Sequence, residues 1–153
     1  MGDDGGIKII CENRKARHNY YLEDRFEAGL VLTGTEVKAL RAGKATLQDA
    51  YAIFQKGELF LLNANISAYT HGNRENHDPL RSRKLLLHKS EIHKLFGKIE
   101  IRGYSLIPVK MYFKKGLAKV EIAIAKGKQS HDKREVTKER EAKRQMDRLK
   151  RLK

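Results

Sequence analysis

The alternation of apolar and polar positions along the chain predicts a protein built mainly of β-strands. Between Tyr20 and Leu32, the apolar residues Tyr21, Phe26 and Leu30 are separated by polar ones, which predicts a strand. Gly29 is the position within it where a bulge is expected.

Two short helices interrupt the strands. Thr33 or Thr35 can cap the first, in which Val37 and Leu40 are three residues apart and after which Gly43 provides a stop. The second follows the apolar run 85–87. We expect Ser90 to cap it and Gly103 to end the helical region, with these side chains sharing one face: Ile92, Leu95 and Phe96.

Two hairpins are predicted from β-prone runs with a glycine in the connection. Ala50–Gln55 and Glu58–Ile66 are joined by Lys56-Gly57, where glycine permits a positive φ. The segment Tyr69–Pro79 that follows has no periodicity, and irregular segments of this length are often functional. We therefore expect an exposed loop there.

The second hairpin comprises Ser105–Phe113 and Leu117–Ala125 around a Lys-Lys-Gly connection, with Pro108 tolerable only at an edge or a bulge. About six strands without a regular βαβ rhythm favour a mainly β fold with short helices. The specific prediction is an oligonucleotide-binding-type Greek-key barrel formed by residues 1–125.

Residues 126–153 form a basic C-terminal tail, with 12 Lys and Arg against 5 Asp and Glu, a net charge of +7. Ala142, Met146 and Leu149 make one narrow helical stripe. Burying a large apolar side chain returns roughly 1.5–3 kcal/mol, whereas fixing the backbone costs about 1–2 kcal/mol for every residue. We therefore expect a tail that is disordered when free and helical against an anionic partner; the alternative is a solvated tail with no partner.

Composition narrows the class of partner. The chain has 33 Lys and Arg against 19 Asp and Glu, a formal net charge of +14, and such an excess favours polyanions. An apolar span of about 18 residues or a strong amphipathic helix, which membrane binding would need, is not evident in the body, so nucleic acid is preferred. Met1–Gly6 does not resemble a signal peptide, and Cys11 is the only cysteine, so a cytoplasmic location is expected.

Two places carry candidate binding chemistry. Asn13–Arg17 puts three cations and an amide in five residues, which suits phosphate and 2′-hydroxyl contacts with a folded RNA. The alternative is an ordinary basic loop. Glu27 can accept hydrogen bonds from a base edge or orient nearby Arg residues, although a lone strand glutamate is more often simply solvated.

Metal and enzyme chemistry are not expected. His88 and His93 are interpreted as surface residues, and the histidines and carboxylates of the 69–79 loop lack a helical His pair or a Cys partner. No phosphate-cradling loop or pair of nucleophile and base is recognisable. The sequence therefore predicts no catalytic residue, no metal and no cofactor. The loop residues considered for a metal are His71, Glu75, His77 and Asp78.

Seven sequence blocks in one order resemble a single bacterial family, small protein B, the SsrA-binding protein. The likeness extends over nearly the whole chain. The blocks are Asn13-Arg-Lys-Ala-Arg-His18, Phe26-Glu-Ala-Gly-Leu30, residues 34–43, Asn76-His-Asp-Pro79, Arg83-Lys-Leu-Leu-Leu-His88, Gly103-Tyr104 with Pro108, and residues 125–134.

The resemblance implies a barrel that binds the tRNA-like domain of transfer-messenger RNA and delivers it to stalled ribosomes for trans-translation. The tail would then enter the decoding centre and the message channel. The resemblance implies Asn13, Glu27 and Leu86 for RNA binding and His131, Asp132, Lys133 and Arg134 for the ribosome-binding tail. With the residues chosen on charge and helical spacing, the full prediction adds Arg14, Lys15, Arg17 and His18 to the first set and Lys126, Lys128, Met146 and Leu149 to the second.

Other functions remain open at this point. A permanent ribosomal protein, or a general binder of structured RNA, would also combine a small barrel with a basic extension. A metal-dependent nuclease using the 71–78 loop would show RNA cleavage that is lost in His77→Ala. No feature of the sequence calls for an obligate dimer, so a monomer is expected.

Overall fold

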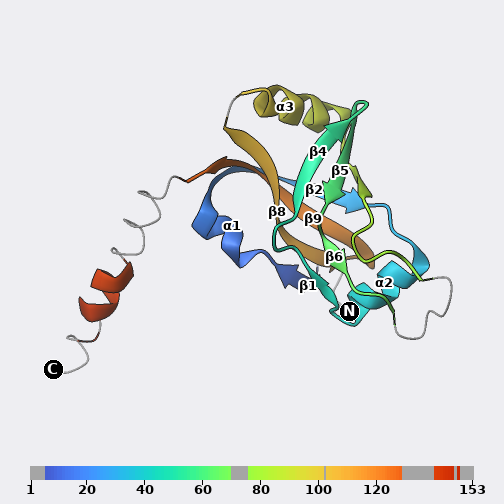
Figure 1. The fold of residues 1–153 in the computed structure, drawn as a ribbon, viewed down its shortest axis with the longest axis horizontal. Coiled ribbons are helices and arrows are strands. Elements are labelled where there is room, and N and C mark those ends of the chain that lie inside the picture. The colour runs from blue at the N-terminus through green and yellow to red at the C-terminus, as the bar shows by residue number, and fades with distance from the viewer. Residues whose placement is uncertain (1–5, 70–75, 102, 129–139, 147, 149–153) are drawn as a thin grey trace.

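The computed structural model describes residues 6–69, 76–101, 103–128, 140–146 and 148 (Figure 1). The body is mainly β-structure with three short helices. Its elements in chain order are β1 (Ile7–Glu12), α1 (Arg14–Asn19), β2 (Tyr20–Leu30), α2 (Gly34–Arg41), β3 (Ala45–Thr46), β4 (Tyr51–Gln55), β5 (Glu58–Leu62), β6 (Asn65–Ile66), β7 (Arg83–Leu86), α3 (Lys89–Ile99), β8 (Tyr104–Lys114) and β9 (Leu117–Gly127).

Six of these strands close into an antiparallel barrel in the order β8-β4-β5-β7-β2-β9, with β9 returning to β8. The second edge of β8 is divided between two strands: β1 pairs with residues 110–114, and β4 pairs through Ala52 and Leu106. The connections from β2 to β4 and from β7 to β8 join strands that are not neighbours in the barrel, as in a Greek key. The predicted fold class is confirmed.

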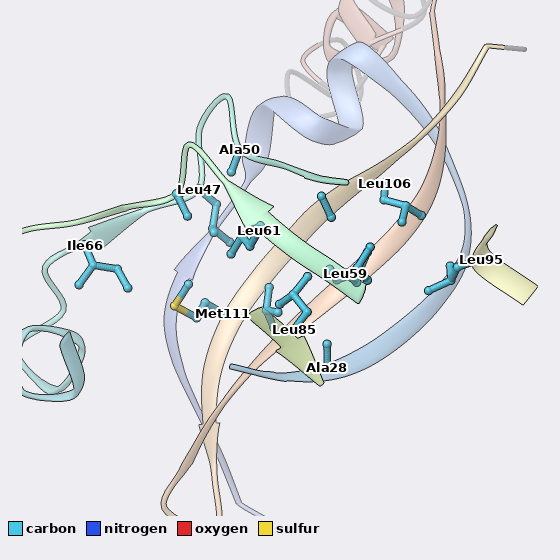
Figure 2. Close-up of a cluster of buried hydrophobic side chains, with 14 of the residues drawn as sticks. Ala28, Leu47, Ala50, Leu59, Leu61, Ile66, Leu85, Leu95, Leu106 and Met111 are labelled. Carbon is cyan, nitrogen blue, oxygen red and sulfur yellow. The ribbon is translucent and has the colours of Figure 1, made fainter. Parts of the chain in front are cut away.

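Inward-facing side chains of alternate strand residues fill the barrel (Figure 2). Leu59 and Leu61 of β5 are fully buried, as are Ile122 and Ile124 of β9 to within 1%. Leu95 of α3 is also fully buried, and Figure 1 shows α3 and α2 on opposite sides of the strands. The alternation of these inward-facing residues along β5 and β9 is the pattern expected of strands with one face on a core.

Both predicted glycine-containing hairpin turns are present. In each, the two central residues have positive φ, 52° and 79° at Lys56 and Gly57, and 52° and 78° at Lys115 and Gly116. This geometry matches the twist of the flanking strands. The predicted run Glu58–Ile66 is broken at Asn63, where φ is 61°, and its last residues pair with Ala45–Thr46 in a separate two-stranded sheet.

The first helix begins as predicted, with Thr33 rather than Thr35 as its cap. Thr33 and Glu36 form a capping box, and Gly43 has a φ of 73° just after the helix. The prediction for α3 was wrong by two residues. His88, not Ser90, is its N-cap, and the Glu91 carboxylate accepts from the His88 backbone N–H at 3.1 Å.

The two predicted strand irregularities have different outcomes. The register between β8 and β9 shifts between Pro108 and Lys110, so of the two places predicted to tolerate Pro108, an edge or a bulge, the structure has the bulge. The bulge predicted at Gly29 was wrong, because β2 shifts register between Leu22 and Arg25. Gly29 stays in register, and a Cβ at this position would lie 3.4 Å from the Cβ of Leu86. A Cβ there would make only ordinary van der Waals contact, so the approach of the neighbouring strand does not require glycine at this position.

Part of the predicted exposed loop is held against the barrel. Residues 70–75, and with them His71 and Glu75, lie outside the described residues. Asn76 bonds through its side chain to both the backbone N–H and the carbonyl of Tyr69, which ties the two ends of the loop together. His77 is only 8% exposed and bonds to Thr35 and to the Ile66 carbonyl, so the expectation of exposure was wrong for this residue.

A buried ion-pair cluster fastens the following segment to α2. Glu36 and Arg83 are both fully buried, and the Glu36 carboxylate also accepts from Arg81 at 2.6 Å and from the Thr33 backbone N–H at 2.8 Å. Arg83 donates further to the Ala64 carbonyl at 2.7 Å. The hydrogen bonds compensate much of the cost of burying these charges.

Candidate nucleic-acid interface

Asn13 fixes the basic helix α1 to the barrel. Its backbone N–H donates to the Val109 carbonyl at 2.8 Å, and its side-chain amide donates to the Pro108 carbonyl at 3.0 Å. Both carbonyls lie at the bulge of β8. Asn13 is 7% exposed, so it supports the binding surface by holding α1 in place.

The inner side of α1 is small, which leaves its cations on the outside. Ala16 is buried against Ile107 and Ala125, and its short side chain lets the helix lie close to β8 and β9. The four other predicted residues of this helix are all exposed: Arg14, Lys15, Arg17 and His18. Arg14, Arg17 and His18 line a hollow of about 260 Å³, together with residues of the barrel that include Arg25 of β2 and Lys110 of β8.

The same surface continues along β2, β9 and β8. The pairing of these strands sets Glu27 of β2, Glu121 of β9 and Lys110 of β8 side by side. Two residues further along β2, Gly29 lies beside Lys119 of β9 and Tyr112 of β8 in the same way. The apolar residues between them point into the core. We call this outer surface the basic face, and its members are Arg14, Arg17, His18, Arg25, Glu27, Leu86, Lys110, Tyr112, Lys114, Lys119 and Glu121.

Glu27 is held at the centre of the basic face by its neighbours. The Tyr112 hydroxyl donates to its carboxylate at 2.5 Å, and the Lys114 ammonium lies 3.4 Å from the same oxygen. The hydrogen bond from Tyr112, followed by the charges of Lys114 and Lys119 acting against partial burial, lowers the pKa of Glu27. Glu27 is therefore ionised at neutral pH, and it orients a phenol and an ammonium; the nearby arginine, Arg25, pairs with Glu121 instead at 3.0 Å.

Leu86 marks the other end of the basic face. Its side chain is 50% exposed, although its neighbour Leu85 is buried in the core. Leu86 pairs with Gly29 of β2, and the Lys119 ammonium lies beside that glycine. The structure thus brings Arg14, Arg17, His18, Glu27 and Leu86 onto one surface, whereas Lys15 lies outside it.

The sequence analysis missed the cations that join these predicted residues. Arg25, Lys110 and Lys119 come from three strands that are distant in sequence, and the pairing of these strands was not predicted. A signal was present, because Lys110, Tyr112 and Lys114 alternate in the sequence with the apolar residues Met111 and Phe113. A period of two would have placed all three on the outer face.

The tail residues are only partly described. β9 continues through Lys126, which pairs with Tyr21 and Tyr104, and the Lys128 backbone N–H donates to the Asn19 carbonyl at 2.8 Å. Residues 140–146 are helical and all exposed, and Met146 is 61% exposed. The remaining predicted tail residues lie outside the described ranges: His131, Asp132, Lys133, Arg134 and Leu149.

Within the described residues, the side chains considered for a metal site make other contacts or lie on the surface. Both ring nitrogens of His77 are hydrogen-bonded within the fold, and Asp78 accepts from the Leu80 backbone N–H at 3.0 Å. His88 and His93 are exposed, as predicted for surface residues. Across the described part of the chain, no three His, Cys, Asp or Glu side chains are grouped to hold a metal ion. None of the helices described is long and apolar enough to span a membrane.

Comparison with known proteins decides the family. The model of the SmpB protein family matches residues 10–152. The chain belongs to the SmpB family. The matched range contains the basic face and all the predicted tail residues.

Close relatives of this SmpB-family chain carry one description. An SsrA-binding protein from Geobacter metallireducens is 60% identical over 141 residues, which cover 92% of each chain. An SsrA-binding protein from Shouchella clausii is 53% identical over 148 residues, 97% of this chain and 95% of the relative. A solved SmpB structure, described as "tmRNA-SmpB: a journey to the center of the bacterial ribosome", is 50% identical with a TM-score of 0.67, covering 78% of this chain and 85% of the other.

Proposed function

We propose that this chain binds the tRNA-like domain of transfer-messenger RNA, the SsrA RNA, and delivers it to stalled ribosomes in the cytoplasm as a monomer. It acts as a binding protein and catalyses no reaction. The observation that carries the proposal is the basic face, on which the cations of α1 are continuous with Arg25, Lys110 and Lys119. Family membership and the names of the relatives point to the same RNA.

The chemistry of the basic face suits a folded RNA. Exposed Arg and Lys side chains contact phosphates and supply most of the affinity, in a manner independent of base sequence. Glu27 is a fixed hydrogen-bond acceptor among these cations, and it can accept from a 2′-hydroxyl or a base edge. Leu86 adds an exposed apolar surface at the end of the row.

We further propose a division of labour between residues 1–125, the RNA-binding barrel, and residues 126–153, the tail that enters the decoding centre and the message channel. Lys126–Lys128 is the junction, since β9 runs through Gly127 and the Lys128 ammonium donates to the Arg17 carbonyl at 3.0 Å. The start of the tail is thereby anchored beside α1, at one end of the basic face.

Sequencing the RNA that co-purifies with the full chain tests the proposal directly. We expect transfer-messenger RNA to be the enriched species, recovered at about one molecule of RNA for each molecule of protein. Stoichiometric retention on idle ribosomes, without enrichment of that RNA, would instead identify a permanent ribosomal protein. Enrichment of many structured RNAs to equal extents would indicate a general RNA-binding protein.

The salt dependence of binding is expected to report the phosphate contacts. If about five phosphates are neutralised, the plot of log affinity against log salt has a slope of about −4. The double variant Arg14→Gln/Arg17→Gln removes two of the cations, so its slope should be smaller in magnitude by roughly 1.5. Fluorescence anisotropy with the labelled tRNA-like domain at four salt concentrations measures both slopes.

The matched control for this measurement is Arg41→Gln/Lys44→Gln. It removes the same charge from exposed positions at the end of α2, outside the basic face. Its slope should equal that of the wild type. Equal losses in the two double variants would show that net charge, rather than the basic face, determines affinity.

A further inference from the structure

A cleft of about 570 Å³ opens beside the basic face, at the weakest seam of the barrel. Within the described residues, β4 and β8 are paired only through Ala52 and Leu106, whereas β8 and β9 are paired along their whole length. The cleft lies at this seam, and its lining comes from β4, β8, α1 and α3. Its volume is in the range of sites that hold small organic molecules.

Aromatic rings form much of the lining. Tyr51 and Phe54 of β4, Phe96 of α3 and Tyr104 of β8 all contribute. Phe96 is 48% exposed and Tyr51 is 38% exposed, although both are large apolar side chains. Phe54 and Phe96 meet edge to face with ring centroids 5.3 Å apart, which fixes the Phe96 ring in position.

The polar part of the cleft is suited to the edges of a base and to its phosphate. Asn19 and Ser105 lie among the lining residues, and each side chain can both donate and accept hydrogen bonds. Lys15 of α1 also lines the cleft, and on the α3 side the Lys98 ammonium lies 4.8 Å from the centroid of the Tyr104 ring. Asp49 is the one carboxylate among the described lining residues, and Glu23 pairs with Lys98 at 3.7 Å, so Lys15 is the cation of the lining that remains for a phosphate.

Continuity with the basic face favours RNA as the occupant. Asn13 lines both this cleft and the hollow that holds Arg14, Arg17 and His18. The six-residue helix α1 therefore separates the cleft from the row of cations, with Lys15 contributing to the cleft. An RNA whose backbone follows the basic face passes the mouth of the cleft.

We propose that this cleft takes one unstacked base of the bound RNA, with its face against Phe96 and Tyr51 and its phosphate near Lys15. The inference rests on the proposed function and adds to it a site for a single nucleotide. Stacking on aromatic side chains holds extruded bases in many RNA complexes and tolerates any base, because every base has a π-face.

Substitutions that remove the rings but keep the apolar volume test the proposal. Phe96→Leu and Tyr51→Leu should each weaken binding of the tRNA-like domain about tenfold, within the range known for loss of one base stack. The slope of log affinity against log salt should not change, because no phosphate contact is lost. Phe96→Tyr, which keeps the ring face, should bind like the wild type.

The control is Ile101→Ala, an exposed apolar residue just beyond α3 that does not line the cleft. It should leave affinity unchanged. Wild-type affinity in both leucine variants would overturn the base site while leaving the proposed function standing. Failure of the wild type itself to bind the tRNA-like domain would overturn the proposed function instead.

Amide NMR spectra of the full chain titrated with hexaadenylate give a test that does not depend on transfer-messenger RNA. We expect saturable shifts at Tyr51, Phe96 and Ser105, and their loss in Phe96→Leu. Shifts confined to other residues, or none at millimolar oligonucleotide, would contradict the proposal. If Met146→Ala shifted the amide signals of Tyr51, Phe96 and Ser105 without any oligonucleotide present, the tail would be shown to occupy the cleft. That result would also overturn the base site.

Discussion

A chain that ends at Lys128 is expected to bind the tRNA-like domain nearly as well as the full chain and to support no trans-translation on stalled ribosomes. Every member of the basic face lies within residues 14–121, and Arg140 is the one described tail residue that lines its hollow, so RNA capture is expected to survive removal of residues 129–153. The tail supplies the contacts within the ribosome, so delivery does not. The end point matters, because Lys126 and Gly127 are strand residues and Lys128 is bonded to Asn19 and Arg17. A chain that ends at Ala125 should also lose stability.

A full-length chain with residues 129–153 in scrambled order is the control for charge. It keeps the composition of the tail but breaks the stripe of Ala142, Met146 and Leu149. We expect normal RNA binding and no trans-translation in a reconstituted translation system programmed with a message that lacks a stop codon. If truncation at Lys128 abolished RNA binding itself, the proposed division of labour would be wrong.

Glu36→Gln is expected to reduce the free energy of unfolding by about 3 kcal/mol. The substitution leaves Arg83 fully buried without a charged partner and weakens the contact with Arg81. Urea denaturation followed by circular dichroism measures the loss. The control is Glu58→Gln, since the Glu58 carboxylate pairs with Lys84 at 2.7 Å on the surface, where such a pair contributes at most about 1 kcal/mol.

The same carboxylate predicts how stability depends on pH. Burial raises the pKa of Glu36, but hydrogen bonds from Arg81, the Thr33 backbone and Arg83 outweigh it and lower the pKa from 4.5 to about 2. A folded pKa below the unfolded one stabilises the protein above pH 4.5, and this contribution is lost as the pH falls toward 2. The difference between wild type and Glu36→Gln should therefore shrink over that range. A constant difference would contradict the assigned role of the carboxylate.

Sequence patterns predicted the elements whose signals are local. Both hairpin turns have glycine where positive φ is needed, and the capping box of α2 is visible as Thr33 followed by Glu36. β1 and α1 were not predicted. The helix has six residues and one buried side chain, Ala16, so no apolar period identifies it. It forms because Asn13 and Ala16 bind it to β8, and this contact is tertiary.

Some local signals were ambiguous for physical reasons. Glycine in a strand often marks a bulge or close approach of another chain segment, but Gly29 shows neither, because it pairs in register and leaves room for a Cβ. Ser90 is a good capping residue, but the side chain of Glu91 reaches back to the backbone of His88 and starts the helix earlier. Polar His77 suggested exposure, yet its ring bonds to Thr35 and Ile66 inside the fold.

The candidate interface was predicted at α1, Glu27 and Leu86, and the strand cations that join them were missed. The cations of α1 adjoin one another in sequence, so their cluster was visible without a structure. Arg25, Lys110 and Lys119 become neighbours only because β2, β9 and β8 pair in a particular register. Register depends on contacts between residues far apart in sequence, and the periodicity of one strand does not contain it.

The proposed structure of the tail depends on a partner molecule. Residues 140–146 are helical, as their propensity predicts. All seven residues are exposed. We therefore expect the free protein to show little stable helix beyond Lys128, and the ribosome-bound protein to show much more.

Directed hydroxyl-radical cleavage from a tethered iron chelate can show whether the basic face contacts the tRNA-like domain. Burial raises the pKa of the Cys11 thiol to about 11, so this cysteine reacts slowly near pH 7 and can stay in place. One chelate is attached at Lys119→Cys on the basic face and another at Lys44→Cys beyond α2. We expect cleavage of the tRNA-like domain from position 119 and none from position 44. Cleavage from position 44 with none from position 119 would contradict the account.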